Sequence, residues 1–179
     1  VVVIQIINIL KPFHLKEAKG YDFSEMMKTK ISYLKDKCNL NDEMFNDLID
    51  ICNKNLDCHS VSLTGGEPLL NINFLKEFVP KSPLPIYLET NGTLFENLKE
   101  VVENITYISS DIKLPSCTGI KELWDVHDKF FDVAKTKILF AKTVFDENIT
   151  DKEIDKIVEL SSKYNIELIL QPKTVNNTT

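Results

Sequence analysis

Apolar positions along the chain follow two different periods, which alternate from the first residue to the last. Short runs in which most residues are apolar or β-branched, such as VVVIQI at the start, are typical of strands buried on both faces. Between these runs, apolar residues recur every three or four positions, as on one face of an amphipathic helix. Strands are expected over residues 1–6, 59–65, 84–92, 106–114, 137–145 and 166–174.

The helical pattern fills each interval between these expected strands. In the second helical segment, Phe45, Leu48 and Cys52 form one apolar stripe. The last segment begins with a capping box, because Thr150 is followed three residues later by Glu153. Helices are expected over residues 22–37, 42–55, 71–80, 94–105, 118–136 and 150–165.

Six strands separated by helices predict an α/β fold with parallel strands joined by right-handed crossovers. A closed barrel of eight such units needs about 250 residues, and this chain has 179. A three-quarter barrel and an open doubly wound sheet both fit the pattern. Residues 1–174 are expected to form one domain, followed by a disordered tail at 175–179.

Composition narrows the expected partners and location. Hydrophobic residues make up 43% of the chain and charged residues 27%, which is typical of a globular domain in water. The net charge is −6 and every basic residue is lysine, so no nucleic-acid partner is expected. No apolar run approaches the roughly 20 residues of a membrane span. Four irregularly spaced cysteines favour free thiols in the cytoplasm over disulfides.

Polar residues, glycine and proline gather at the ends of the expected strands. In both parallel architectures the active site lies at the carboxyl ends of the strands. Here the segments at those ends read LTGGEP, ETNGT, SDIKLPS, KTVFDE and LQPKT. The turns at the other pole carry ordinary polar spacers. This asymmetry predicts a site at the carboxyl ends.

The segment LTGGEP suggests the chemistry of that site. Gly65 and Gly66 let the backbone approach a ligand and direct N–H groups at it, while Glu67 can accept from an ammonium group. These residues suit a ligand with both a carboxylate and an amine, such as an amino acid. The alternative is a tight turn into a helix, with Glu67 at the helix N-terminus, where an acid is favoured.

Other polar residues leave two interpretations open. Asp111 and Lys113 point to the same face of their strand and form either an internal ion pair or a clamp for a ligand. Asn91 and Gly92, taken alone, are typical of a turn. His127 lies on an expected helix and is more typical of a solvated or structural histidine than of a catalytic one.

Taken together and in this order, TGGEPLL, LETNGT, SDIKLPS and LILQP resemble the motifs of the radical S-adenosylmethionine superfamily. Within it, the chain is most similar to the 7-carboxy-7-deazaguanine synthases and their archaeal-type relatives, from Val1 to about Thr174. The resemblance implies a partial (β/α)6 barrel of the TIM-like type that holds S-adenosylmethionine, a [4Fe–4S] cluster and Mg²⁺. It also implies a pterin-like substrate, 6-carboxytetrahydropterin, which loses ammonia on the way to queuosine or archaeosine.

The resemblance also implies roles for individual residues. Those expected to bind S-adenosylmethionine are Gly65, Gly66, Glu67, Ser110, Asp111, Lys113 and Gln171. Those expected near the substrate are Thr64, Thr90, Asn91 and Pro172. An electron donor such as flavodoxin or ferredoxin and a homodimer are further implications.

One part of the superfamily pattern is absent. The cluster motif, Cys-x3-Cys-x2-Cys, should follow the first strand, but VVVIQI runs there into INILKPFHLKEAKGYDF. Cys38 and Cys52 are expected on helices at a spacing that does not match a cluster loop. The superfamily member's Gln-Gly-Glu-Gly segment and substrate-binding arginine are absent too. We favour a cluster loop missing from the sequence between about residues 6 and 11 over a cluster-free relative.

Three functions therefore compete. The main hypothesis is a radical S-adenosylmethionine lyase that makes 7-carboxy-7-deazaguanine. The second is an activase that installs a glycyl radical on a partner enzyme, which requires a large open groove. The third is a cluster-free barrel that binds S-adenosylmethionine or a partner protein without catalysis.

Overall fold

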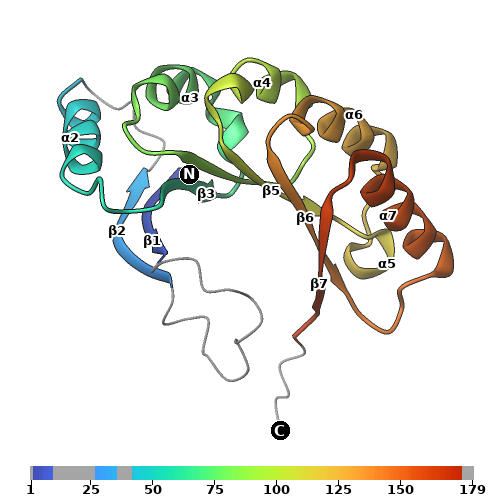
Figure 1. The fold of residues 1–179 in the computed structure, drawn as a ribbon. Coiled ribbons are helices and arrows are strands. Elements are labelled where there is room, and N and C mark those ends of the chain that lie inside the picture. Colours follow the sequence, from blue (N-terminus) through green and yellow to red (C-terminus); the bar gives the residue numbers. More distant parts are fainter. Residues whose placement is uncertain (1, 10–26, 36–41, 175–179) are drawn as a thin grey trace, which may run out of the picture.

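The computed structural model describes residues 2–9, 27–35 and 42–174, which form one curved sheet with helices along its convex side (Figure 1). The sheet has seven strands in the order β2-β1-β3-β4-β5-β6-β7. The strands are β1 (Val2–Ile9), β2 (Met27–Lys35), β3 (Ser60–Gly65), β4 (Ile86–Thr90), β5 (Tyr107–Ile112), β6 (Ile138–Phe145) and β7 (Glu167–Pro172).

The helices follow the strands in the expected alternation from β3 onward. The α-helices are α2 (Asp42–Asn53), α3 (Ile72–Phe78), α4 (Phe95–Lys99), α5 (Pro115–Thr118), α6 (Trp124–Ala134) and α7 (Asp151–Tyr164). The short 3₁₀ helices are η1 (Pro68–Asn71), η2 (Val79–Lys81) and η3 (Val102–Asn104). In the described part of the chain, no helix is long and apolar enough to cross a membrane.

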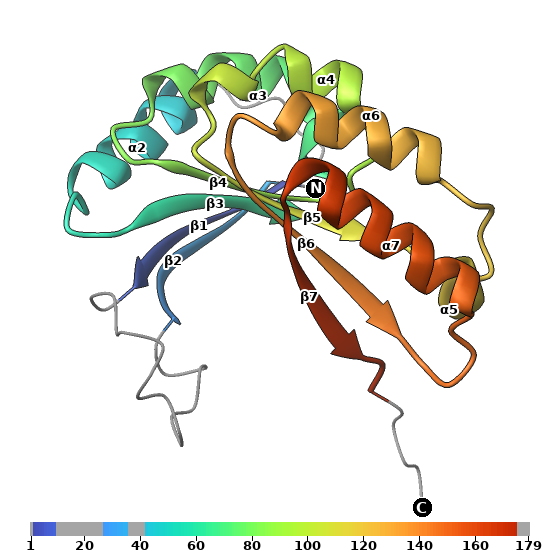
Figure 2. The same ribbon diagram turned by 45° about the vertical axis from the view of Figure 1, so that its right-hand side comes forward.

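Strands β3 to β7 are parallel, which confirms the α/β class. Each is joined to the next through helical segments on the convex side, so their carboxyl ends lie along one edge of the sheet (Figure 2). The capping box predicted at the start of the last helix is confirmed. Thr150 Oγ1 accepts from the backbone N–H of Glu153 at 3.3 Å, and the Glu153 carboxylate accepts from the backbone N–H of Thr150 at 2.9 Å.

The first strand differs from the expectation of a uniformly parallel sheet. Strand β1 is antiparallel to β3, with Ile4 opposite Leu63, and is also antiparallel to β2. A parallel pair needs a crossover connection, usually a helix, whereas a neighbour along the chain can pair directly as an antiparallel strand. The expectation of six parallel strands is therefore wrong, and the described parallel set comprises β3 to β7.

The helix predicted over residues 22–37 is also wrong where the structure describes that segment. Residues 27–35 form β2 instead, and residues 22–26, 36 and 37 lie outside the described part. The sequence allows both periods, because Thr29, Ile31 and Tyr33 also alternate with polar residues. Pairing with β1 along its whole length selects the strand.

Two other expected helices are shorter than predicted. The segment 94–105 divides into α4 and η3. Within the segment 118–136, the helix α6 begins only at Trp124. The residues before it belong to α5, which is followed by Gly119, whose φ of 70° is in the left-handed region. Glycine is the usual residue at such a helix end because it adopts this conformation without a steric penalty.

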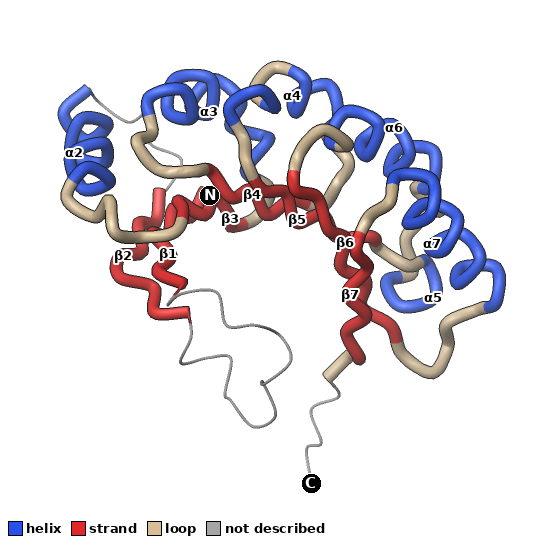
Figure 3. Tube along the Cα trace, viewed as in Figure 1, coloured by secondary structure: helices blue, strands red, loops and turns tan. Residues whose placement is uncertain are grey.

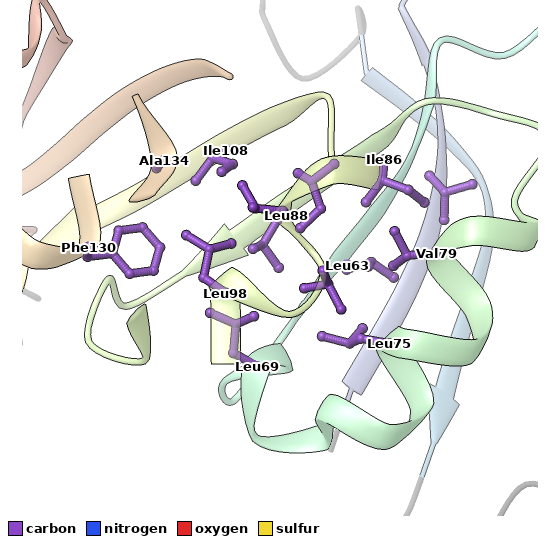
Figure 4. Packing of buried hydrophobic residues seen from close by; sticks show 14 of the residues in the cluster. Leu63, Leu69, Leu75, Val79, Ile86, Leu88, Leu98, Ile108, Phe130 and Ala134 are labelled. Atoms are coloured by element: carbon purple, nitrogen blue, oxygen red, sulfur yellow. The ribbon is translucent and has the colours of Figure 1, made fainter. Parts of the chain in front are cut away.

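The hydrophobic core lies between the convex face of the sheet and the helices (Figures 3 and 4). Leu63, Leu88 and Ile108 are neighbours on three adjacent strands and are completely buried. Leu75 from α3 and Phe130 from α6 cover them from the helical side. Each such side chain contributes about 1.5–3 kcal/mol of burial free energy, so the core holds the carboxyl ends of the strands in a fixed arrangement.

The opposite, concave face of the sheet carries a different set of side chains. Along β4, Ile86, Leu88 and Thr90 are buried on the helical side, while Tyr87 and Glu89 point to the concave face. Side chains of alternate residues on each strand therefore reach the concave face, where the structure forms its candidate site.

Candidate functional site

A cavity of about 430 Å³ lies at the carboxyl ends of β3, β4, β5 and β6. This is the edge that the strand-end pattern predicted for the site. The residues that line it are Thr64, Gly65, Gly66, Glu89, Thr90, Asn91, Ser109, Asp111, Lys113 and Lys142. Seven of them were predicted from the sequence as site residues, and Glu89, Ser109 and Lys142 were not.

Strand register explains why these side chains meet. Glu89 lies opposite Ser109 in the β4–β5 pair, and Asp111 lies opposite Lys142 in the β5–β6 pair. Residues opposite one another in adjacent parallel strands share a face of the sheet. In the sequence, Ser109 could have been found by extending the period of two back from Asp111, and Glu89 by extending it back from Asn91, whereas Lys142 is placed only by the β5–β6 register.

An aromatic layer lies on the concave face next to this polar layer, two residues earlier on each strand. The ring centroids of Tyr87 and Tyr107 are 6.1 Å apart, and those of Tyr87 and Phe140 are 5.9 Å apart. Burial raises the pKa of Tyr87 to about 12, so its hydroxyl stays protonated at neutral pH. The cavity itself is lined by polar residues and glycine at the strand ends, and the aromatic layer lies next to it on the concave face, toward the amino ends of the strands.

The two glycines after β3 open the cavity wall. Gly65 has a φ of 118°, which L side chains rarely adopt. A Cβ atom placed on Gly66 would meet no atom within 4 Å, so the backbone of Gly66 faces open space. The backbone at Gly65 and Gly66 can therefore approach a ligand in the way that the sequence predicted.

Glu67 makes three hydrogen bonds inside the protein. Its Oε1 accepts from the backbone N–H of Leu69 at 3.1 Å and from Thr90 Oγ1 at 2.9 Å, and its Oε2 accepts from the backbone N–H of Asn91 at 2.7 Å. The side chain is buried and does not line the cavity. The carboxylate thus caps η1, as one of the two sequence interpretations proposed, and it joins the loop after β3 to the turn after β4. Its contact with a ligand amine stays a prediction.

The turn after β4 is closed by its own side chains. Asn91 Oδ1 accepts from the backbone N–H of Thr93 at 3.0 Å and from its hydroxyl at 2.6 Å, and Thr90 Oγ1 accepts from the backbone N–H of Gly92 at 3.2 Å. The turn predicted for Asn91 and Gly92 is confirmed, and Gly92 has a φ of 69°. Because Oδ1 of Asn91 is engaged, its amide N–H groups are the part of the side chain that can donate to a ligand.

Two lysines on the cavity wall share the carboxylate of Asp111. Lys113 Nζ lies 2.8 Å from Asp111 Oδ2, and Lys142 Nζ lies 3.8 Å from Asp111 Oδ1. Glu89 adds a second carboxylate, whose Oε1 accepts from Ser62 Oγ at 3.3 Å. The sequence left an ion pair and a ligand clamp open for Asp111 and Lys113. The structure has the ion pair, and both residues line the cavity.

Besides Glu67, three residues predicted for the site do not line the cavity. Ser110 is completely buried on the helical side of β5, with Thr90 as its neighbour in the β4–β5 pair. Gln171 and Pro172 are exposed at the carboxyl end of β7 and do not line the cavity. The sequence motif places these residues at strand ends correctly, but it does not say which face each one occupies.

No group of three or more histidine, cysteine or acidic side chains that could hold a metal ion is found among residues 2–9, 27–35 and 42–174. Cys52 and Cys58 are buried, Cys117 is partly exposed, and Cys38 lies outside the described residues. Burial raises the pKa of Cys52 to about 11, so its thiol is unreactive at neutral pH. The interval proposed for a missing cluster loop falls partly on β1, and its other residues lie outside the described part.

The chain is similar to curated proteins that are each named 7-carboxy-7-deazaguanine synthase. This confirms the resemblance to these synthases that the sequence motifs indicated. It is 43% identical over 119 residues to the 7-carboxy-7-deazaguanine synthase of Geobacter sulfurreducens, covering 64% of this chain and 48% of the relative. It is 29% identical over 120 residues to that of Archaeoglobus fulgidus, covering 64% of this chain and 52% of the relative. The chain thus spans about half the length of these two relatives.

A shorter segment matches a third relative. Over 58 residues the chain is 47% identical to the 7-carboxy-7-deazaguanine synthase of Methanothermobacter thermautotrophicus, covering 32% of this chain and 24% of the relative. No family model matches the chain.

Proposed function

We propose that the chain is a radical S-adenosylmethionine lyase of the 7-carboxy-7-deazaguanine synthase type. In this reaction 6-carboxytetrahydropterin is converted to 7-carboxy-7-deazaguanine with loss of ammonia. The parallel strands β3 to β7 would form most of a partial (β/α)6 barrel of that superfamily.

The observation that carries the proposal is the convergence of three separate motifs on one cavity. TGGEP, ETNGT and SDIKLPS are about 20 residues apart in the sequence, yet each contributes residues to the same wall. These motifs were the basis of the resemblance to the superfamily. The relatives that carry the synthase name support the same assignment.

The size and lining of the cavity support S-adenosylmethionine as its ligand. Its volume of about 430 Å³ is in the usual range for small-molecule sites, roughly 300–1,000 Å³. The open backbone at Gly65 and Gly66 would receive the amino-acid part, and the two lysines and two carboxylates that line the cavity match a ligand of mixed charge. When bound and given one electron, S-adenosylmethionine would release methionine and supply the 5′-deoxyadenosyl radical that removes a hydrogen atom from the substrate.

In this proposal the chain's own residues bind and orient the two ligands. Gly65, Gly66, Asp111 and Lys113 would hold the cofactor, and Ser110 and Glu67 would support them from behind the wall. Thr64, Thr90 and Asn91 would face the pterin. Gln171 and Pro172 keep the roles implied by the motif only if the end of β7 approaches the bound ligands.

The described residues include no group of three or more histidine, cysteine or acidic side chains that could hold an iron–sulfur cluster or Mg²⁺, and we derive no step through either. A cluster, Mg²⁺, a flavodoxin or ferredoxin as electron donor and a homodimer are proposed from the resemblance alone. A cytoplasmic location and the absence of a nucleic-acid or membrane partner are proposed from the cysteines, the net charge and the lengths of the apolar runs.

The size of the cavity favours a small substrate over a protein substrate. A glycyl-radical activase needs a groove that admits a loop of its partner, whereas the described cavity, of about 430 Å³, has the usual size of a small-molecule site. We therefore place the pterin reaction ahead of the activase reaction.

The test uses the protein as its gene encodes it, purified without oxygen and reconstituted with iron and sulfide. We expect a brown iron–sulfur absorbance and, with S-adenosylmethionine, reductant and 6-carboxytetrahydropterin, one ammonia for each 7-carboxy-7-deazaguanine formed. Mass spectrometry identifies the product. A matched variant, Lys113→Ala, should lose turnover, while Lys76→Ala on the distant surface should retain it. A reconstituted protein without iron and without product would refute the proposal.

A further inference from the structure

His127 occupies an unusual place for a polar side chain. It lies on α6, is completely buried and does not line the cavity. Its ring stacks on Phe131, with centroids 6.1 Å apart. An apolar side chain would fill this position without desolvating a polar group, so the contact made by the imidazole needs an explanation.

The imidazole makes its hydrogen bond to the turn after β4. Nδ1 lies 3.1 Å from the backbone carbonyl oxygen of Gly92. A carbonyl can only accept, so Nδ1 carries the proton and donates it. Among the described residues Nε2 has no hydrogen-bond partner, as expected for the lone pair of a neutral ring. Burial lowers the pKa of His127 to about 4, which keeps the ring neutral near pH 7.

Gly92 is packed tightly between two elements. A Cβ atom at this position would overlap Ser110 Oγ on β5 and would lie 3.1 Å from His127 Nδ1 on α6. The turn therefore has no room to move toward the helices. The carbonyl oxygen of Gly92 accepts the hydrogen bond from His127 Nδ1.

Glu67 holds the same turn from its other end. Its carboxylate accepts from the backbone N–H of Asn91 at 2.7 Å, while His127 donates to the carbonyl of Gly92 at 3.1 Å. The segment between these two anchors includes Asn91, which lines the cavity. Loops that bind ligands are usually the more mobile parts of a fold, and this one is fixed at both ends by buried side chains.

We propose that His127 is a positioning residue, which holds the turn formed by Thr90, Asn91 and Gly92 in the geometry that the ligand of the cavity requires. It acts through Gly92 and touches no ligand itself. The identity of that ligand as S-adenosylmethionine rests on the proposed function, whereas the effect on the turn does not.

The experiment compares three variants of the protein as its gene encodes it. His127→Leu removes the donor at similar size, and His127→Asn retains a donor near the position of Nδ1. Phe130→Leu, on the same helix, loosens the core without removing a bond to the turn. Amide hydrogen exchange of residues 91–93 is measured without ligand, and S-adenosylmethionine binding is measured by calorimetry.

We expect His127→Leu to speed exchange at residues 91–93 at least tenfold and to weaken S-adenosylmethionine binding at least tenfold. His127→Asn should restore both to within about threefold of the wild type. Phe130→Leu should lower the unfolding midpoint with binding close to that of the wild type. If His127→Leu does not fold, His127→Gln replaces it, because its longer side chain displaces the donor.

Two results would overturn the proposal. One is that His127→Leu speeds amide exchange at residues 91–93 no more than Phe130→Leu does. The other is equal loss of binding in His127→Leu and His127→Asn. A wild-type protein that binds no S-adenosylmethionine refutes the proposed function, and the exchange measurement still decides the role of His127.

Discussion

The loops after β3 and β4 each carry a glycine, but only Gly66 lines the cavity, whereas Gly92 does not, and the two serve opposite purposes. Gly66 faces open space, because a Cβ atom there would meet nothing within 4 Å. Gly92 faces packed protein, because a Cβ atom there would overlap Ser110 Oγ. The loop after β3 therefore offers its backbone to a ligand, and the turn after β4 is the rigid support beside it. Glu67 joins the two loops through the hydrogen bonds to Thr90 and Asn91.

The largest effect is expected from Gly92→Ala. The new methyl group must displace Ser110 or His127, and alanine is strained at a φ of 69°. Overpacking and left-handed backbone together cost about 4 kcal/mol in the free energy of unfolding. Urea denaturation followed by circular dichroism measures this loss. A change below about 1 kcal/mol would show that the turn is not packed as described.

A slightly smaller effect is expected from acid. The pKa of His127 is about 4 in the folded protein and near 6.5 when unfolded, so the unfolded state binds the extra proton first as the pH falls. Stability should therefore drop between pH 6.5 and pH 4, by roughly 3 kcal/mol from this residue alone. Unfolding free energies across that range should show the drop in the wild type and a much weaker one in His127→Asn. Identical pH profiles would contradict the buried neutral imidazole.

Glu67→Gln should cost less, because the side chain keeps its shape. The amide has one acceptor oxygen for the partners that two carboxylate oxygens now serve. Charged hydrogen bonds of this kind contribute about 2 kcal/mol. Glu96→Gln is the matched control, since Glu96 makes an exposed ion pair with Lys99 and should change stability by less than about 0.5 kcal/mol. Equal effects of the two substitutions on the denaturation midpoint would remove Glu67 as the link between the loops.

The sequence predicted the parallel half of the fold well, for a physical reason. From β3 onward each strand is a short apolar run followed by an amphipathic helix, and the two periods cannot be confused there. The segment with Thr29, Ile31 and Tyr33 satisfies both periods, and its state depends on pairing with β1. Local patterns do not contain that long-range information.

The sequence also predicted part of the site and missed the residues that depend on how the strands pair. Gly65, Asn91 and Asp111 were located because glycine, turn residues and charges at strand ends are visible in the sequence. Lys142 was missed because only the β5–β6 register brings it beside Asp111. For Glu67 the sequence left two interpretations open, a contact with a ligand and a cap on the following helix. It could not decide between them, because hydrogen bonds to a segment more than 20 residues away cannot be predicted from the motif.

The most direct test of the account replaces the open glycine. Gly66→Val should change the free energy of unfolding by less than about 1 kcal/mol, because the new side chain enters open space. The same side chain would occupy the room that the ligand needs. Equilibrium dialysis of the intact protein with S-adenosylmethionine should give one saturable site in the wild type and at least tenfold weaker binding in Gly66→Val. Equal binding by the two proteins, or none by the wild type, would contradict the placement of the cofactor at this corner.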